Sequence, residues 1–294
     1  MGKGSLKAHK TLLIIFYLSG LSFAAGVLIK GYHYYILPLH QRPHSPLHAL
    51  LKPGGVLGHG LGIAGSTMML LLFLYSVRKR ELFGLRFGKI RYWLNIHIFF
   101  GIVGPVLVTL HTAFKFGGIV AISYFSMIAV MLSGFVGRYL YVQIPRALSG
   151  DELSMKEMDE KNKLMTRLLR EKYGVDQMFL QEIEKLSGVT EQHNFRGLLA
   201  IFSILKNDLS RPFRVRKLKR QILQQTTFSK KEIHNLIELA NQKAILIRKM
   251  TLLSSIQPLF HLWHVIHKPF AYIMIIFMLI HVFVTILFGY RWIF

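Results

Sequence analysis

Four histidines have the side chains and the spacing to do chemistry. His97 and His111 bracket the uncharged stretch IFFGIVGPVLVTL, and His267 and His281 stand at the same interval around KPFAYIMIIFMLI. An ionisable ring inside an apolar segment costs free energy, so such residues usually serve a function. Neutral imidazole is a common metal ligand, and ligation also offsets the cost of burying the ring. The repeated interval therefore predicts that the two segments together form two metal-binding sites, one near each end.

The elements that must position these rings are apolar helices. The chain is 52% hydrophobic and has a net charge of +23, which suits a membrane protein with basic loops. A helix needs about 20 apolar residues to cross a bilayer. The run from Thr11 to Ile29 is too long for a signal peptide and predicts a retained helix. In total we expect five spans, at about 11–30, 56–77, 92–114, 118–142 and 258–290.

The basic residues predict the orientation of these spans. Lysines and arginines gather in the first ten residues, in the loop after the second span and in the long loop after the fourth. By the positive-inside rule, these three regions and the N-terminus are cytoplasmic, and the C-terminus lies outside. We expect an integral protein of a bacterial cytoplasmic (inner) membrane, in contact with membrane lipid.

The segment 143–256 differs in composition from the rest of the chain. It contains every acidic residue except Glu81, and its apolar residues recur at helical spacing. Gly174 predicts a helix end, and Ser229 with Glu232 predicts a capping box at a helix start. We therefore expect residues 1–142 to form transmembrane helices 1–4, residues 143–256 a cytoplasmic domain of three or four helices, and residues 257–294 transmembrane helix 5.

The histidine interval also predicts how the rings pair. Fourteen residues make nearly four helical turns, so each pair shares one face, about 21 Å apart. Spans three and five run in the same direction, which places His97 level with His267 and His111 level with His281. Two axial imidazoles from facing helices are what the iron of a b-type haem requires. The predicted fold is an all-α membrane protein, a five-transmembrane-helix bundle holding two stacked haems with a helical cytoplasmic insert between helices 4 and 5.

The double His-x13-His pattern resembles the ligand set of respiratory cytochrome b and of the ferric reductase-like transmembrane family. The resemblance implies two haem b groups, with His97 and His267 on the inner iron and His111 and His281 on the outer iron. It covers the spans and not the insert. Ferric reductase-like proteins commonly have six spans, often followed by a flavin domain, and respiratory cytochrome b has more spans than the five expected here.

The predicted function is transmembrane electron transfer by a bis-histidine di-haem cytochrome b. The sequence has no cysteine, which excludes iron–sulfur clusters and covalent c-type haem, and it has no flavin or nicotinamide motif. Electrons must then come from quinone or from another redox subunit, so we expect a membrane subunit of a larger oxidoreductase complex. Two alternatives remain open. The chain is a redox-silent transporter or anchor, or it is a terminal reductase whose acceptor meets the loop histidines His33, His40, His44 and His48.

Several other residues admit two interpretations. His261 and His264 precede His267 and are alternative ligands, although neither stands fourteen residues from His281. His59 is either a contact of the outer haem or quinone or a satisfied polar residue. Lys115 and Arg291 are candidate partners of outer haem propionates.

Three short motifs complete the predictions. The glycines of GLGIAG, residues 60–65, lack the strand that a dinucleotide site requires, so they predict close helix packing. Gly101, Gly104 and Pro105 either let a macrocycle approach span three or serve the same packing. The basic run RPFRVRKLKR, residues 211–220, predicts a face for anionic lipid or an acidic redox partner, with no nucleic acid.

Overall fold

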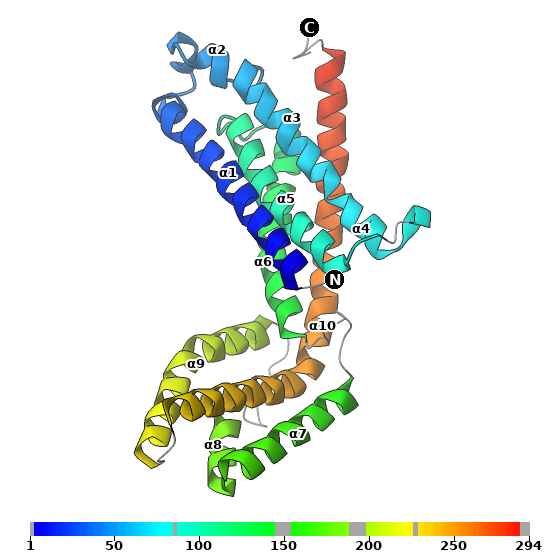
Figure 1. The fold of residues 1–294 in the computed structure, drawn as a ribbon. Helices are drawn as coiled ribbons and strands as arrows, with labels where there is room; N and C mark the ends of the chain where they lie inside the picture. Colours follow the sequence, from blue (N-terminus) through cyan, green and yellow to red (C-terminus); the bar gives the residue numbers. More distant parts are fainter. Residues whose placement is uncertain (1–2, 85–86, 145–153, 188–197, 226–228, 289–294) are drawn as a thin grey trace. The chain divides into compact units, whose positions relative to one another are not determined.

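The computed structural model describes residues 3–84, 87–144, 154–187, 198–225 and 229–288, which form helices joined by turns and loops, with no strand among them (Figure 1). Five segments are long and apolar enough to cross a membrane, as the sequence predicted. The first four lie in α1 (Lys3–Ile36), in α2 to α4 (His48–Leu51, Val56–Leu71 and Phe73–Lys79), in α5 (Ile90–His111) and in α6 (Val120–Gln143). The fifth, Pro258–Leu287, belongs to α10 (Lys230–Leu287). The short helices η1 (Arg42–His44) and η2 (Leu82–Gly84) lie in loops.

The chain divides into two compact units, which we call the span unit and the insert unit. The span unit comprises residues 1–136 and 264–294, and the insert unit comprises residues 137–263. The sequence analysis placed these boundaries about six residues further into the insert. The difference has a packing reason, because Leu140 packs against Leu259 and Ile144 against Ile256, all of them buried. The last turns of α6 therefore pack with the insert unit.

The end of the insert required a correction. The sequence analysis treated the segment opened by the capping box and the last span as separate helices. The structure has one helix, α10, from Lys230 to Leu287. Its N-terminus is the predicted capping box: the Ser229 backbone N–H donates to the Glu232 carboxylate over 2.9 Å, and the Glu232 N–H donates to Ser229 Oγ over 3.3 Å.

The insert unit contains α7 (Met155–Tyr173), α8 (Gln177–Ser187), α9 (Leu198–Gln225) and the first part of α10. Gly174 ends α7 with φ of 61°, a left-handed conformation that glycine adopts without strain. The core joins three of these helices through buried aliphatic side chains: Leu169, Leu180, Ile183, Leu186, Ile233, Leu236, Ala240 and Ala244. The described part of the insert unit thus contains three whole helices and the start of a fourth, where the sequence analysis expected three or four helices.

Close packing of α3 on α5 organises the span unit (Figure 1). A Cβ atom added at Gly65 would lie 2.7 Å from Val108 Cγ2 and 3.1 Å from the Gly104 carbonyl oxygen, and one added at Gly104 would lie 3.5 Å from the Gly65 carbonyl oxygen. Only glycine lets the two backbones approach this closely. The packing interpretation of GLGIAG is therefore confirmed for Gly62 and Gly65. Gly104 also serves helix packing, one of the two interpretations offered for it.

Arg42 has a structural role that its place in a polar loop did not reveal. Its side chain is only 5% exposed, and it donates to the carbonyl oxygens of Tyr35 (2.7 Å), Leu37 (3.0 Å) and Ala113 (2.6 Å). Tyr35 is in the last turn of α1, Leu37 directly follows α1, and Ala113 follows the end of α5. A helix end leaves carbonyls without intrahelical partners, and the guanidinium satisfies them in fork geometry. Arg42 therefore ties α1 to the end of the helix that carries His97 and His111.

Candidate functional site

The structure brings His111 and His281 together. The ring of His111, at the end of α5, lies with its centroid 6.4 Å from that of His281 on α10, at an interplanar angle of 55°. An imidazole nitrogen lies about 2 Å from a metal ion that it binds, so two imidazoles on opposite sides of one ion have centroids roughly 6 Å apart. The two rings thus stand at the separation that one shared ion requires.

The orientation of His111 is set by its neighbours on the α3 side. Its Nδ1 lies 2.8 Å from the carbonyl oxygen of Gly58. A carbonyl oxygen can only accept, so Nδ1 carries the proton and Nε2 keeps its lone pair. A Cβ atom at Gly62 would lie 2.6 Å from this Nδ1, so the ring occupies the space that glycine leaves.

A cavity of about 200 Å³ adjoins the two rings. Its wall is mainly apolar and includes four methionines, Met69, Met127, Met274 and Met278. Methionine is flexible and fills irregular gaps, so this wall can change shape at low cost. The polar part of the wall, besides the two histidines, consists of Ser66, Thr112, Lys115, Ser123 and Tyr124.

His97 and His267 form the second pair and lie within electrostatic range of each other. His97 Nδ1 lies 3.1 Å from the Leu72 carbonyl oxygen, so this nitrogen is also protonated. His267 Nδ1 lies 2.7 Å from Ser133 Oγ, and Ser133 donates its own proton to the Val130 carbonyl over 2.8 Å. Ser133 must then accept from His267. Three of the four histidines therefore have Nδ1 engaged as a donor and Nε2 left as the basic nitrogen.

An apolar cluster lies between the two pairs along the helices. Met274 stands seven residues from both His267 and His281 and packs with side chains of α3 and α6. The buried members of the cluster are Met69, Leu72, Met127, Met274 and Met278, with Phe100 and Val108 packed against them. The space along the helices between the two pairs is therefore occupied by buried apolar side chains.

The structure also places the other residues that the sequence analysis considered as ligands or haem contacts. His59 lies within electrostatic range of His111 and His281, and His264 within that of His267. His48 bonds Tyr34 (3.1 Å), whereas His33, His40, His44 and His261 are exposed. Arg291 lies outside the described residues. Within the part of the chain that the structure describes, no group of three or more His, Cys, Asp or Glu side chains could hold a metal ion.

The sequence analysis missed Ser133, Gly62 and Gly58 as partners of the histidines. Serine and glycine are common in membrane helices, so nothing in their type or position distinguished these three. The His267–Ser133 bond joins residues 134 positions apart, and only the packing of α6 against α10 decides it.

No protein-family model, curated protein or solved structure matches this chain. The fold and the site define a class of protein: an all-helical chain with five helices long and apolar enough to cross a membrane, compatible with an integral membrane protein, that brings four histidines together as two pairs.

Proposed function

We propose that this protein is a di-haem b-type cytochrome that transfers electrons across a membrane. The observation that carries the proposal is the facing of the His111 and His281 rings at 6.4 Å. Each iron would be held by two histidines, one from α5 and one from α10. His97 and His267 would hold the first haem, and His111 and His281 the second.

The hydrogen bonds of the rings support haem ligation. Metal-ligating histidines usually donate the other ring N–H to a carbonyl or a similar acceptor, which orients the ring and raises its basicity. Such acceptors are the carbonyls of Leu72 and Gly58 and the hydroxyl of Ser133. A histidine that only linked two helices would have no need of a second one at ligand distance.

The size of the cavity beside His111 and His281 bears on whether a haem can bind there. About 200 Å³ is below the range of roughly 300–1,000 Å³ that is usual for ligand pockets, so a whole porphyrin requires the methionine wall to move. Methionine side chains adapt readily to a planar aromatic surface. The donor set and the spacing of the rings fit a haem, whereas the cavity is large enough for one only if the methionine side chains move. Lys115 is the cation placed to pair with a propionate.

Bound haem would supply a one-electron carrier at each level. The protein residues hold the ligand nitrogens in place, and the apolar cluster around Met274 occupies the space between the two pairs. We propose that electrons enter from a quinone or a protein partner and that the chain is a subunit of a larger redox complex. The proposed setting is a bacterial cytoplasmic (inner) membrane with the N-terminus inside. The insert unit then offers a cytoplasmic surface to that partner.

A spectrum and a haem count test the proposal. The purified full-length protein should show low-spin b-type haem in reduced-minus-oxidised spectra, with two haems per chain. His111→Ala and His267→Ala should each lose one haem. His261→Ala, which changes an exposed histidine of the helix that carries His267, should lose none. A folded protein from haem-replete cells that is colourless would refute the proposal and favour a redox-silent transporter.

A further inference from the structure

The loop between α4 and α5, residues 80–89, exposes apolar side chains. Phe83, in η2, is 93% exposed, the largest exposed fraction among the large apolar side chains that the structure describes. Leu82 and Phe87 of the same loop are 44% and 62% exposed. Figure 1 shows η2 standing clear of the other helices of the span unit. Exposed apolar side chains that gather in one short loop indicate an interaction surface.

The backbone at Phe83 is strained. Phe83 and Glu81 have φ of 55° and 52°, in the left-handed region that residues with a Cβ atom rarely adopt. Such strain costs free energy and is retained mainly at functional sites. The conformation that exposes Phe83 therefore points to a function of this side chain.

Two side chains hold the second half of the loop against the adjoining helices. Arg78 of α4 donates from Nε to the Phe87 carbonyl oxygen (3.1 Å) and from Nη2 to that of Gly88 (3.0 Å). Trp93 of α5 donates from Nε1 to the Phe87 carbonyl oxygen (3.2 Å), and the two rings meet at a centroid distance of 5.1 Å and an angle of 67°. The loop is thus attached to the end of α4 and to the start of α5.

These helix ends are also ends of candidate membrane spans. The second span ends at Lys79 and the third begins at Ile90. Span ends stand at the level of the lipid headgroups, where tryptophan is enriched, and Trp93 lies in the first turn of α5. In a membrane, the loop and its exposed Phe83 therefore adjoin the surface of the bilayer.

The charge of this region indicates the kind of lipid. Residues 77–92 include six basic side chains and one acidic side chain. Among the basic ones, Arg80, Lys89 and Arg91 are exposed. Basic residues next to a membrane attract anionic lipids. An acidic protein surface would attract the same cations, but it would not explain an exposed phenylalanine at the level where two spans end.

We propose that the α4–α5 loop is a membrane anchor. Phe83 inserts among the lipid chains next to the headgroups, and Arg80, Lys89 and Arg91 bind the phosphate groups of anionic lipids around it. Interfacial helices bind membranes in the same way, by apolar side chains combined with flanking cations. Lipid binding by this loop is a property separate from electron transfer, and its test does not require haem.

A single-cysteine label tests the insertion of Phe83. The sequence has no cysteine, so F83C provides one labelling site in the full-length protein. The protein labelled with the fluorophore NBD is placed in phosphatidylcholine nanodiscs whose acyl chains carry, or lack, a doxyl spin label close to the headgroup. The spin label quenches only nearby fluorophores, and we expect it to reduce the emission at least about twofold. The control is M178C, at a 74% exposed position of α8, which is not a candidate span, and its emission should fall by less than about a tenth.

A second comparison tests the cations. Addition of phosphatidylglycerol should increase the quenching at position 83, since the cations draw the loop to an anionic surface. R80Q/K89Q in the F83C protein should abolish this increase. K156Q/K161Q removes the same formal charge from exposed positions of α7 and should leave the increase unchanged.

Three results would overturn the proposal. Quenching at position 83 that is no stronger than at position 178 would mean that the loop does not insert. An increase with phosphatidylglycerol that both double variants abolish would mean that net charge, and not this loop, attracts the lipid. Quenching at position 83 that phosphatidylglycerol does not change would exclude anionic lipid and leave an acidic protein as the partner of the cations. If F83C does not fold by circular dichroism, L82C is labelled instead, and absence of quenching there would equally refute insertion.

Discussion

Replacing Gly62 with alanine should remove the haem proposed between His111 and His281 and leave the other in place. The added Cβ would lie 2.6 Å from His111 Nδ1 and 2.8 Å from its Cε1, whereas ordinary contacts begin at 3.4 Å. The ring must therefore move by about 0.8 Å. Overpacking of this kind costs about 1–3 kcal/mol, and the bond from Nδ1 to the Gly58 carbonyl contributes about 1 kcal/mol. A loss of about 3 kcal/mol is on the order of a hundredfold in affinity.

The assay is the haem content of purified full-length protein, measured together with the reduced-minus-oxidised spectrum. We expect G62A to retain about one haem per chain where the wild-type protein has two. The control is Gly134→Ala, since a Cβ atom at Gly134 in α6 would meet no atom within 4 Å. If G62A holds two haems with an unchanged spectrum and midpoint potentials, His111 is not held as a ligand by this contact and the reasoning is refuted.

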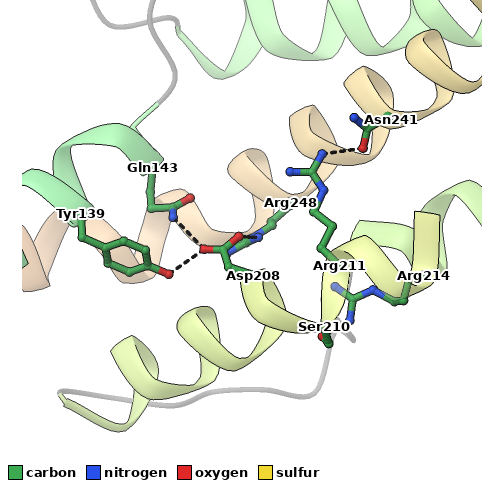
Figure 2. A network of polar contacts seen from close by, with 8 residues as sticks. All are labelled: Tyr139, Gln143, Asp208, Ser210, Arg211, Arg214, Asn241 and Arg248. Carbon is green, nitrogen blue, oxygen red and sulfur yellow. Dashed lines mark hydrogen bonds and ion pairs between the residues drawn. The ribbon is translucent and has the colours of Figure 1, made fainter. Parts of the chain in front are cut away.

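Three further predictions concern single hydrogen-bonding side chains. Ser133→Ala removes the acceptor of His267 Nδ1, so we expect a changed midpoint potential for one haem and an unchanged one for the other, measured by redox titration. Arg42→Met leaves three carbonyls without their donor and should cost at least about 2 kcal/mol, seen as a lower unfolding temperature in detergent; an unchanged temperature would exclude this structural role. Burial raises the pKa of Asp208. The hydrogen bond from Arg248, with those from Tyr139 and Gln143 (Figure 2), lowers the pKa by more, so that it lies below the ordinary value of 3.8. A carboxyl group with a depressed folded pKa stabilises the fold above its unfolded pKa and loses that contribution as pH falls. Acid unfolding followed by circular dichroism should therefore lose stability below about pH 3.8 in the wild-type protein, and Asp208→Asn should be less stable by about 2–3 kcal/mol at pH 7 and show less of this pH dependence.

The parts of the fold that depend on residues close in sequence could be predicted. The five spans follow from the length of apolar runs, and their limits in the structure differ by a few residues because helix ends depend on caps and contacts. The capping box at Ser229 and the glycine stop at Gly174 were also readable, since each involves residues close in sequence. The continuity of α10 was not, because no local rule decides whether the chain stays helical between two adjoining helical segments.

Only part of the candidate site could be predicted from the sequence. Equal intervals between His97 and His111 and between His267 and His281 place the rings on one face of each helix, and this follows from helical geometry alone. The protonated nitrogen of three of the rings, in contrast, depends on acceptors supplied by Gly58 in α3, Leu72 between α3 and α4, and Ser133 in α6. From the sequence, Arg42 could be described only as a loop residue. Its three acceptor carbonyls come close together only when α1 and α5 pack together.

The sequence by itself determined that this chain has five apolar helices, a charged helical insert and four histidines at one repeated interval. These properties depend on composition and on the 3.6-residue period, and both act over a few turns of helix. Only the tertiary structure decided that His111 and His281 face each other, that Gly62 and Ser133 orient the rings, and that Asp208 on α9 bonds to Tyr139 on α6 and to Arg248 on α10. Each of these contacts joins residues that lie on different helices, most of them far apart in the sequence, and their free energies exist only after the helices have packed.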